Sequence, residues 1–563
     1  MNNLEILEII VILGTLTLLT PVLGGFMAKV FTGEKTFLHR VLRPLESLVY
    51  RLLCIDEMKE MNWKEYTLAI VALNALGFAF LFFLQLAQGH LPLNPANLSG
   101  TSWHLAFNTA VSFMTNTNWQ AYAGETTMSY FTQMAGLGVQ NFLSAATGIA
   151  VLLALIRGLT RKNTADLGNA WVDLTRSVIY VLLPLATVLT LLLVQQGVVQ
   201  NFDGPTPVMT LEGIEQRIPQ GPAASQIAIK QLGTNGGGYF NANSAHPLEN
   251  PTPFSNFLQM LAILLIPASL TYTFGIMVGK RRQGWMIFIA MMLMLLAALA
   301  AGLWAEHSPN PVMGTAAAME GKETRFGVTN SVMWAIFTTA ASNGSVNAMH
   351  ASLSPLTGGI AMFNIMLGEV IFGGVGCGLY GMLLFAILTV FLAGLMVGRT
   401  PEYLGKKIEA KDIQWTMIGI LAPGVMILIG AGISVILPVA LSSLSHPGPH
   451  GLSEILYAFS SAAGNNGSAF AGLNANTPFY NFTLGFAMLV GRFAVMIPAL
   501  IVAGNLVQKK ISQPSPGTFP TDTGLFVLLL IGVIAIVGGL TFFPALSLGP
   551  IVEHFLMLQG RTF

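Results

Sequence analysis

Four segments of the chain carry residues that could bind a monovalent cation. Each is rich in Gly, Asn, Ser and Thr, and none has an acidic residue at its centre, which argues against a calcium-selective carboxylate ring. Uncharged oxygens suit a large, weakly hydrated monovalent ion, whereas magnesium keeps its water and prefers carboxylates. Glycine allows the positive φ with which several carbonyls can point at one ion. The segments are centred on Thr115–Thr117, Thr234–Gly236, Ser342–Gly344 and Asn465–Gly467.

The same four segments recur together with a second landmark. Their third positions lie 119, 108 and 123 residues apart. After each segment, an apolar stretch opens with Asn and an apolar residue, at Asn141, Asn256, Asn364 and Asn481. One Asn-Gly pair would be an ordinary turn, but two landmarks in the same order four times indicate internal duplication. We interpret the four landmark asparagines as N-caps or interhelical hydrogen bonders, without a ligand role.

The composition predicts that a membrane surrounds these loops. Of the 563 residues, 53% are apolar and 9% charged, against about 25% charged in soluble proteins. About 20 apolar residues span a bilayer. Ten windows satisfy that length: Ile9–Ala28, Thr67–Gln88, Ser129–Ile156, Ser177–Gln196, Phe254–Gly279, Gln283–Ala305, Met362–Gly398, Gln414–Val439, Phe479–Gln508 and Gly524–Ala545.

The fold class expected from these windows is an all-α polytopic membrane protein. About ten transmembrane helices would form four helix–pore loop–helix repeats around a pseudo-fourfold axis, with one extra helix at each end. The expected boundaries are 1–30 for the first extra helix, 62–160, 174–282, 283–400 and 412–510 for the repeats, and 522–547 for the last helix. Ten spans put both termini on one side, and we expect that side to be extracellular because 20 of the 26 basic residues then fall in inner connections.

Charge and cysteine content exclude several classes of function. A net charge of +1 lacks the basic surface that nucleic acid requires. The two cysteines, Cys54 and Cys377, offer no CxxC or Cys/His metal spacing, which excludes disulfide and zinc frameworks. No Walker A or DKTGT motif is present, so the chain cannot by itself be an ATPase, and we expect no catalytic residue in it.

Two charges interrupt the long apolar spans, Glu369 and Arg492. Charged groups in a membrane are expensive and usually paired, so they could belong to the ion path or form a purely structural salt bridge between repeats three and four. The glycines around Glu369 make a continuous helix doubtful. We expect a break that acts as a gate below the loops, with close helix packing as the alternative; the gate candidates are Gly373, Gly374, Gly376 and Gly378.

Over essentially its whole length the sequence resembles the potassium-binding subunit of the Kdp-type potassium-importing ATPases, itself similar to the Trk/Ktr branch of potassium transporters. The matching strings are NTNWQ at 116–120, GTNGGGYFNANSAHPLENPTPFSN at 233–256, SNGSVNAM at 342–349 and GNNGSAF at 464–470. The resemblance implies a selectivity filter lined by Asn116, Thr117, Thr234, Asn235, Gly236, Ser342, Asn343, Gly344, Asn465, Asn466 and Gly467.

The resemblance also implies the partners and the location. This chain would share the bacterial cytoplasmic (inner) membrane with three partners: an ATP-hydrolysing P-type subunit, a single-span subunit and a very small accessory membrane subunit. Potassium would be the transported ligand, with no other tightly bound cofactor, and it would leave sideways through an intersubunit tunnel. Two alternatives stay open: a self-contained Trk/Ktr-like channel or symporter, and a structural membrane subunit with degenerate loops.

Overall fold

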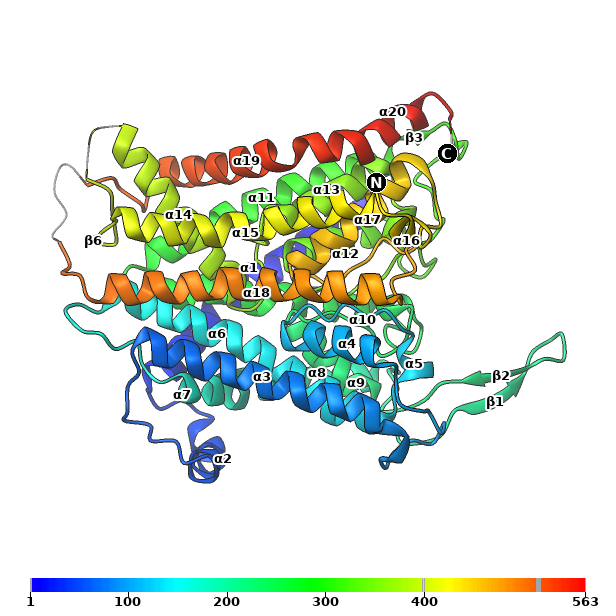
Figure 1. Ribbon diagram of the computed structural model, residues 1–563, viewed down its shortest axis with the longest axis horizontal. Helices are drawn as coiled ribbons and strands as arrows, with labels where there is room; N and C mark the ends of the chain where they lie inside the picture. Colours follow the sequence, from blue (N-terminus) through cyan, green and yellow to red (C-terminus); the bar gives the residue numbers. More distant parts are fainter. Residues whose placement is uncertain (1–2, 397, 399, 513–517, 562–563) are drawn as a thin grey trace.

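The computed structural model describes residues 3–396, 398, 400–512 and 518–561. Arg399, one of the basic residues expected in an inner connection, lies outside them. Within the described residues, ten helical stretches are long and apolar enough to cross a membrane, which confirms the predicted number. They run side by side, with both chain ends at the same end of the bundle (Figure 1). The spans are α1 (Asn3–Thr32), α3 with η1 (Trp63–His90), η2 with α6 (Thr132–Thr160), α7, η3 and α8 (Ala170–Gln195), α10 (Pro253–Met277), α11 (Arg281–His307), α14 (Cys377–Met396), α15 (Ala410–Ser434), α18 (Pro478–Val507), and α19, η6 and α20 (Gly524–Leu558).

The seventh span differs from its prediction. The window Met362–Gly398 is not one helix: α13 (Pro355–Met366) ends early, and α14 begins only at Cys377. Between them the backbone has positive φ at Gly368, Glu369, Phe372 and Gly376, which no α-helix accommodates. The break therefore starts before the glycines that predicted it, and Gly378 belongs to α14.

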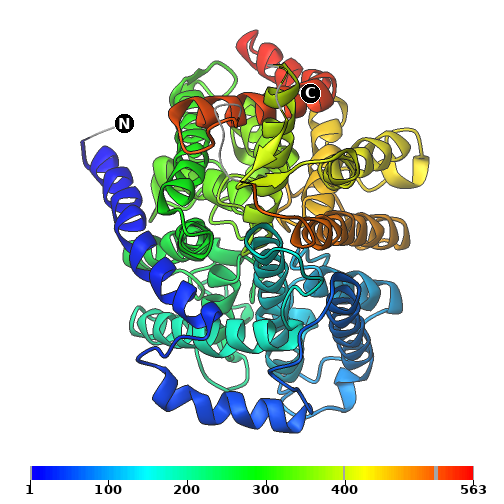
Figure 2. The same cartoon turned by 90° about the vertical axis from the view of Figure 1, so that its left-hand side faces the viewer.

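A short, buried helix lies between the two spans of each repeat. These pore helices are α4 (Trp103–Met114), α9 (Ala223–Leu232), α12 (Gly327–Ala340) and α17 (Gly448–Ala463). The view along the spans in Figure 2 shows the four repeats following one another around a common centre, with α1 and α19 on the periphery. The re-entrant organisation expected from the loops is thus present.

The landmark asparagines join neighbouring elements and are not N-caps. Thr252 and Thr477 cap α10 and α18, so Asn256 and Asn481 lie in the first turns of those helices. Asn256 Nδ2 donates to Asn330 Oδ1 of α12 at 3.4 Å, and Asn481 Nδ2 lies 2.8 Å from His104 Nδ1 of α4. The interhelical alternative is therefore confirmed for these two asparagines, because buried amides in a membrane must find partners.

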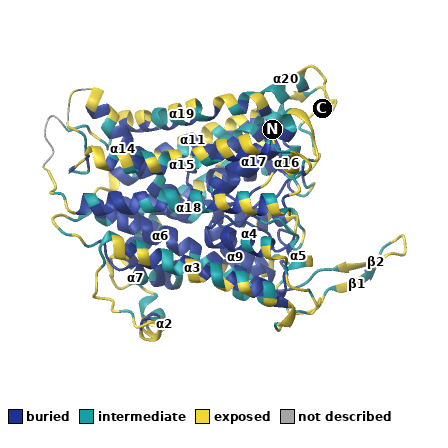
Figure 3. Ribbon diagram, in the orientation of Figure 1, coloured by how far each residue is buried: buried dark blue, intermediate teal, exposed yellow. Residues whose placement is uncertain are grey.

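Burial separates inner from outer helices (Figure 3). In the span Thr132–Thr160, 83% of the most apolar window is buried in protein, against 33% in Ala410–Ser434 and in Gly524–Leu558. The pore helices carry buried polar groups such as Ser112, Thr338 and Ser461. Protein, rather than lipid, must therefore surround the irregular backbone that follows each of them.

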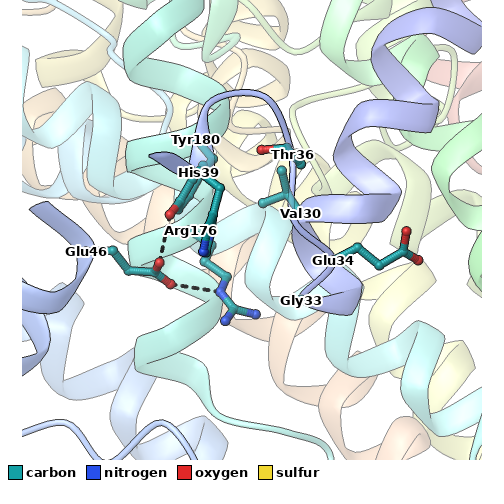
Figure 4. Close-up of a pocket in the computed structure, with 8 residues that line it drawn as sticks. All are labelled: Val30, Gly33, Glu34, Thr36, His39, Glu46, Arg176 and Tyr180. Carbon is teal, nitrogen blue, oxygen red and sulfur yellow. Dashed lines mark hydrogen bonds and ion pairs between the residues drawn. The ribbon is translucent and has the colours of Figure 1, made fainter. Parts of the chain in front are cut away.

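One amphipathic helix, α2 (His39–Leu52), lies at the end of the bundle opposite the termini (Figure 1). Its buried Glu46 accepts hydrogen bonds from Arg176 Nε at 3.0 Å and Tyr180 OH at 2.8 Å (Figure 4). Tyr50 donates a third at 2.7 Å. Burial by itself would raise the pKa of Glu46, but these donors and Arg43 outweigh it and hold the pKa at about 2.

The remaining elements are short. Among the described residues, antiparallel hairpins pair β1 with β2, β3 with β4 and β5 with β6. The first projects beyond the bundle on the side of the termini (Figure 1). The strands are Thr206–Met209, Glu215–Ile218, Pro309–Asn310, Thr315–Ala316, Glu402–Tyr403 and Lys406–Lys407. The short helices are η1 (Gln88–His90), α5 (Gly124–Thr127), η2 (Thr132–Gly138), α7 (Ala170–Arg176), η3 (Ser177–Leu182), α8 (Leu183–Gln195), η4 (Asn243–Ala245), η5 (His350–Ser352), α16 (Pro438–Leu441), η6 (Ser547–Ile551) and α20 (Val552–Leu558). Three long helices are continuous with short ones within a single span: α3 (Trp63–Ala87), α6 (Val139–Thr160) and α19 (Gly524–Leu546).

Candidate ion-binding site

All four pore helices end in the same backbone geometry. Just after each helix, one residue that is not glycine takes a positive φ, between 47° and 68°, at Asn116, Thr234, Ser342 and Asn465. The next residue donates its N–H to the carbonyl five residues earlier, over 2.8 to 3.1 Å: Thr117 to Ser112, Asn235 to Lys230, Asn343 to Thr338 and Asn466 to Ser461. Such bonds satisfy helix carbonyls that would otherwise be buried without partners.

This geometry corrects the register of the first loop. The glycines of the other three loops, Gly236, Gly344 and Gly467, follow the donating residue, with φ of 67°, 81° and 96°. In the first loop that place belongs to Asn118, with φ 53°, and not to Thr117. The prediction that aligned Thr117 with the glycines was wrong by one residue. Asn is the residue type that, after glycine, best tolerates the left-handed region, and that preference is the signal the sequence offered.

The loops meet in a ring. A Cβ atom on Gly236 would lie less than 3.0 Å from the carbonyl oxygen of Asn343. Gly344 stands in the same relation to Asn466 O, and Gly467 to Thr117 O. Loop two therefore contacts loop three, loop three contacts loop four, and loop four contacts loop one.

The contact between loops one and two completes the circle through side chains. Asn118 Nδ2 donates to Gly236 O at 3.2 Å, and Asn116 Nδ2 donates to Thr234 O at 3.0 Å. Asn118 also donates to the landmark Asn141 at 2.7 Å. Between loops one and two, polar side chains thus replace the close contact between a glycine and a carbonyl oxygen that joins the other loops.

The loop side chains bond to protein and leave the ring carbonyls free. Asn343 Oδ1 accepts from the Ser345 N–H at 3.0 Å, and its Nδ2 donates to Lys230 O at 3.0 Å. Asn466 repeats this pattern with Ser468 and Thr338, at 3.1 and 2.9 Å. In the described part of the chain, no hydrogen bond reaches the carbonyl oxygens of the donating residues, Thr117, Asn235, Asn343 and Asn466. Four unpaired, uncharged oxygens in a ring can replace the water shell of a monovalent cation.

The segment between α13 and α14 lies against the base of this ring. The Val375 N–H donates to Thr234 Oγ1 at 2.8 Å. A Cβ on Gly374 would meet Ser342 Cβ at 3.4 Å, and one on Gly376 would collide with the backbone of Gly148. The backbone of Gly373 packs closely on that of Gly378 across the break. The four gate candidates therefore let this segment approach two filter loops and α6.

Glu369 and Arg492 are both buried, but they do not form an ion pair within 4.0 Å in the described part of the chain. Arg492 Nη2 donates to Ser144 O at 2.8 Å, while its Nε has no hydrogen-bond partner. Glu369 Oε1 lies 3.3 Å from the point that a Cβ on Gly464 would occupy, and it too has no partner. The direct salt bridge considered for this pair is absent, but the two charges still interact electrostatically, and Ser342 and Asn466 of the filter loops lie within hydrogen-bonding reach of Glu369.

A small cavity lies beside the same region. Its lining includes Gly368 of the broken segment, Gly464 at the base of the fourth loop and Phe385 of α14. Residues of α13, α15 and α19 complete its wall, and α15 and α19 are its outer helices. These two helices are among the spans least covered by protein.

The chain resembles known proteins over nearly its full length. Residues 10–555 match the family described as "Potassium-transporting ATPase A subunit". Two relatives named "Potassium-transporting ATPase potassium-binding subunit" are 57% identical in Rhodospirillum centenum, covering 99% of this chain and 98% of the relative, and 56% identical in Pseudomonas aeruginosa, covering 98% and 99%.

A solved structure shares the fold. The potassium transporter TrkH from Vibrio parahaemolyticus superposes with a TM-score of 0.52 at 12% identity, covering 88% of this chain and 96% of that one. That likeness shows the fold alone, whereas the family match and the two relatives show that the chain belongs to the family of potassium-transporting ATPase A subunits.

Proposed function

We propose that this chain is the potassium-binding, ion-selecting and translocating subunit of an ATP-driven potassium import complex, and that it performs no hydrolysis itself. The observation that carries the proposal is the ring of unpaired carbonyls formed by four equivalent loops. Neutral carbonyls favour a weakly hydrated monovalent ion over divalent ions, which demand anionic ligands. The relatives' names identify that ion as potassium.

The filter would consist of the eleven residues expected from the sequence, with Asn118 added at the glycine position of the first loop. We keep the repeat boundaries 62–160, 174–282, 283–400 and 412–510, because each encloses one pore helix and its loop. The ion would enter from the end of the bundle where the termini lie. The clustering of basic residues at the opposite end supports a periplasmic or extracellular position for the termini in a bacterial cytoplasmic membrane.

The path beyond the filter would turn sideways. The broken segment occupies the region directly beneath the ring, where a straight pore would have to continue. The cavity between Gly368, Gly464 and α15 offers a lateral direction instead. A P-type ATPase subunit would dock at that exit, together with one single-span and one small accessory subunit, which the sequence resemblance implies.

Reconstitution tests the proposal. The purified chain in liposomes should bind potassium without conducting it, and ATP-driven uptake should require the P-type subunit. The fold shared with TrkH makes a self-contained channel the competing function. Potassium-selective conductance by the chain alone, independent of ATP, would establish the competitor and reject the pump subunit.

A further inference from the structure

The outer end of the fourth pore helix carries a cluster of potential metal ligands. His446, His450 and Glu454 recur every four residues, which places the last two on one face of α17. One donor atom from each of the three residues lies within 4.8 Å of the others. The spacing of the two cysteines excludes only zinc sites built on thiolates. It does not apply to this cluster, because its donors are imidazole and carboxylate groups.

The carboxylate of Glu454 is the first sign that the cluster has a ligand. Its side chain is fully buried, and His446 Nδ1 lies 2.7 Å from Oε1. The second oxygen, Oε2, is buried and has no hydrogen-bond partner in the described part of the chain. Burying a carboxylate oxygen without a partner is unfavourable, and bound cations commonly satisfy such groups.

His450 is held in an orientation that metal-binding histidines typically have. Its Nδ1 lies 2.8 Å from Glu553 Oε1 on α20. A carboxylate that accepts the Nδ1 proton fixes the tautomer and leaves the Nε2 lone pair for a metal. Glu553 would therefore act as the orienting partner of a ligand, outside the coordination shell.

The cluster is reachable from solvent. His446 and His450 line a cavity of about 460 Å³ together with Gly472, Glu553 and Met557, and Glu454 lies behind this lining. The His446 side chain is 55% exposed, so an ion could enter without unfolding of the helix. Gly472 packs closely against Glu454 Oε1, and any Cβ there would displace the carboxylate.

We propose that His446, His450 and Glu454 bind a divalent transition-metal ion of the zinc class. Two imidazoles and one carboxylate are donors that such ions prefer over calcium or magnesium, and a fourth position would remain for water. An ion that took Nδ1 of His446 would require the neutral imidazole to carry its proton on Nε2, so the proton between Nδ1 and Glu454 would be exchanged through solvent to Nε2. Because α17 runs from this cluster to the filter loop at Asn465, the ion would fix the segment that holds His446 to the outer end of this pore helix.

The test uses the full-length chain without a histidine tag, freed of metal and then exposed to Zn²⁺ or Co²⁺ alone. Elemental analysis should find one tightly bound equivalent, and Co²⁺ should give the absorption of a low-coordinate nitrogen and oxygen site. His446→Ala is the primary variant, because an exposed side chain can be removed without disturbing the fold. Glu454→Gln removes the charge, and both variants should lose the bound equivalent.

Two further variants sharpen the result. Glu553→Gln should weaken affinity by about tenfold while keeping the stoichiometry, as expected of an orienting partner. His90→Ala, which alters an exposed histidine outside the cluster, should bind as the unmodified chain does. Absence of binding by the unmodified chain, or an unchanged Co²⁺ spectrum in the His446→Ala, Glu454→Gln double variant, would overturn the proposal.

Discussion

Gly467 of the fourth loop lies against the carbonyl oxygen of Thr117 of the first loop, and this contact joins the two ends of the repeated region. The same contact joins Gly236 to Asn343 and Gly344 to Asn466. The ring thus depends on glycine at three positions, for two reasons. The backbone there has a positive φ, and the carbonyl oxygen of the neighbouring loop leaves no space for a Cβ atom.

Gly467→Ala should reduce the discrimination of potassium from sodium more than it reduces folding. A Cβ at this position would push the Thr117 carbonyl out of the ring, and the left-handed backbone adds a penalty of about 1–2 kcal/mol. Ion selectivity of ATP-driven uptake by the reconstituted complex measures the effect. Gly236→Ser and Gly344→Ala should give graded versions of it. The matched control is Gly432→Ala, since nothing lies within 4 Å of a Cβ there; equal selectivity of Gly467→Ala and this control would show that Gly467 is not a filter residue.

Asn118 should behave as the glycine equivalent of the first loop. Asn118→Val places a β-branched residue at φ 53° and removes the hydrogen bonds to Gly236 and Asn141, so it should impair selectivity as Gly467→Ala does. Asn118→Gly keeps the backbone geometry and should be milder. Both variants are compared by sodium inhibition of potassium uptake, and a milder effect of Asn118→Val than of Asn118→Gly would contradict the corrected register.

The sequence predicted the spans and loops better than the contacts between them. Long apolar windows and Gly/Asn segments are local signals, and they identified ten spans and all four loops. The register of Thr117 was missed, because Asn118 resembles glycine only in its backbone conformation, for which the tolerance of Asn for positive φ was the one local signal. Whether Glu369 and Arg492 form an ion pair likewise depends on how the helices pack, and their opposite charges alone do not determine it. The break in the seventh span was visible as clustered glycines, but positive φ at Glu369 moved its start upstream.

Glu369→Gln and Arg492→Gln should each impair transport while leaving potassium binding at the filter largely intact. Both groups lie beneath the ring, so they would affect an ion only after it has passed the carbonyls. No direct ion pair joins them, but the two charges interact electrostatically, so their effects on thermal stability should be somewhat less than additive in the double variant. Isothermal potassium titration, ATP-driven uptake and thermal unfolding separate the three quantities. Recovery of both stability and transport in the double variant would support the interpretation of the two residues as a purely structural pair.

The docking of α2 should depend on pH through Glu46. Its pKa of about 2 in the folded chain lies below the ordinary 4.5, so its stabilising contribution is complete above pH 4.5 and is lost as the pH falls toward 2. Amide protection of residues 39–52, corrected for intrinsic exchange, should fall over that range. Glu46→Gln should show low protection already at neutral pH and no further fall, because an amide cannot serve as the charged acceptor for Arg176. Unaltered protection in this variant would mean that apolar packing alone holds α2.

The barrier beneath the filter should depend on one hydroxyl group. Thr234 Oγ1 accepts the Val375 N–H at 2.8 Å, and this bond ties the broken segment directly to a filter loop. Thr234→Val keeps the shape of the side chain but removes the acceptor, so the segment should loosen and potassium should leak through liposomes that hold the chain alone. Thr234→Ser retains the hydroxyl and serves as the matched control, with no leak expected. A shorter segment, made by deleting one of the glycines between 373 and 376, should leak more strongly and without any requirement for ATP. If neither Thr234→Val nor the deletion conducts, the segment does not close a straight pathway. The proposed lateral exit would then be supported only by the cavity that residues of α14, α15 and α19 line.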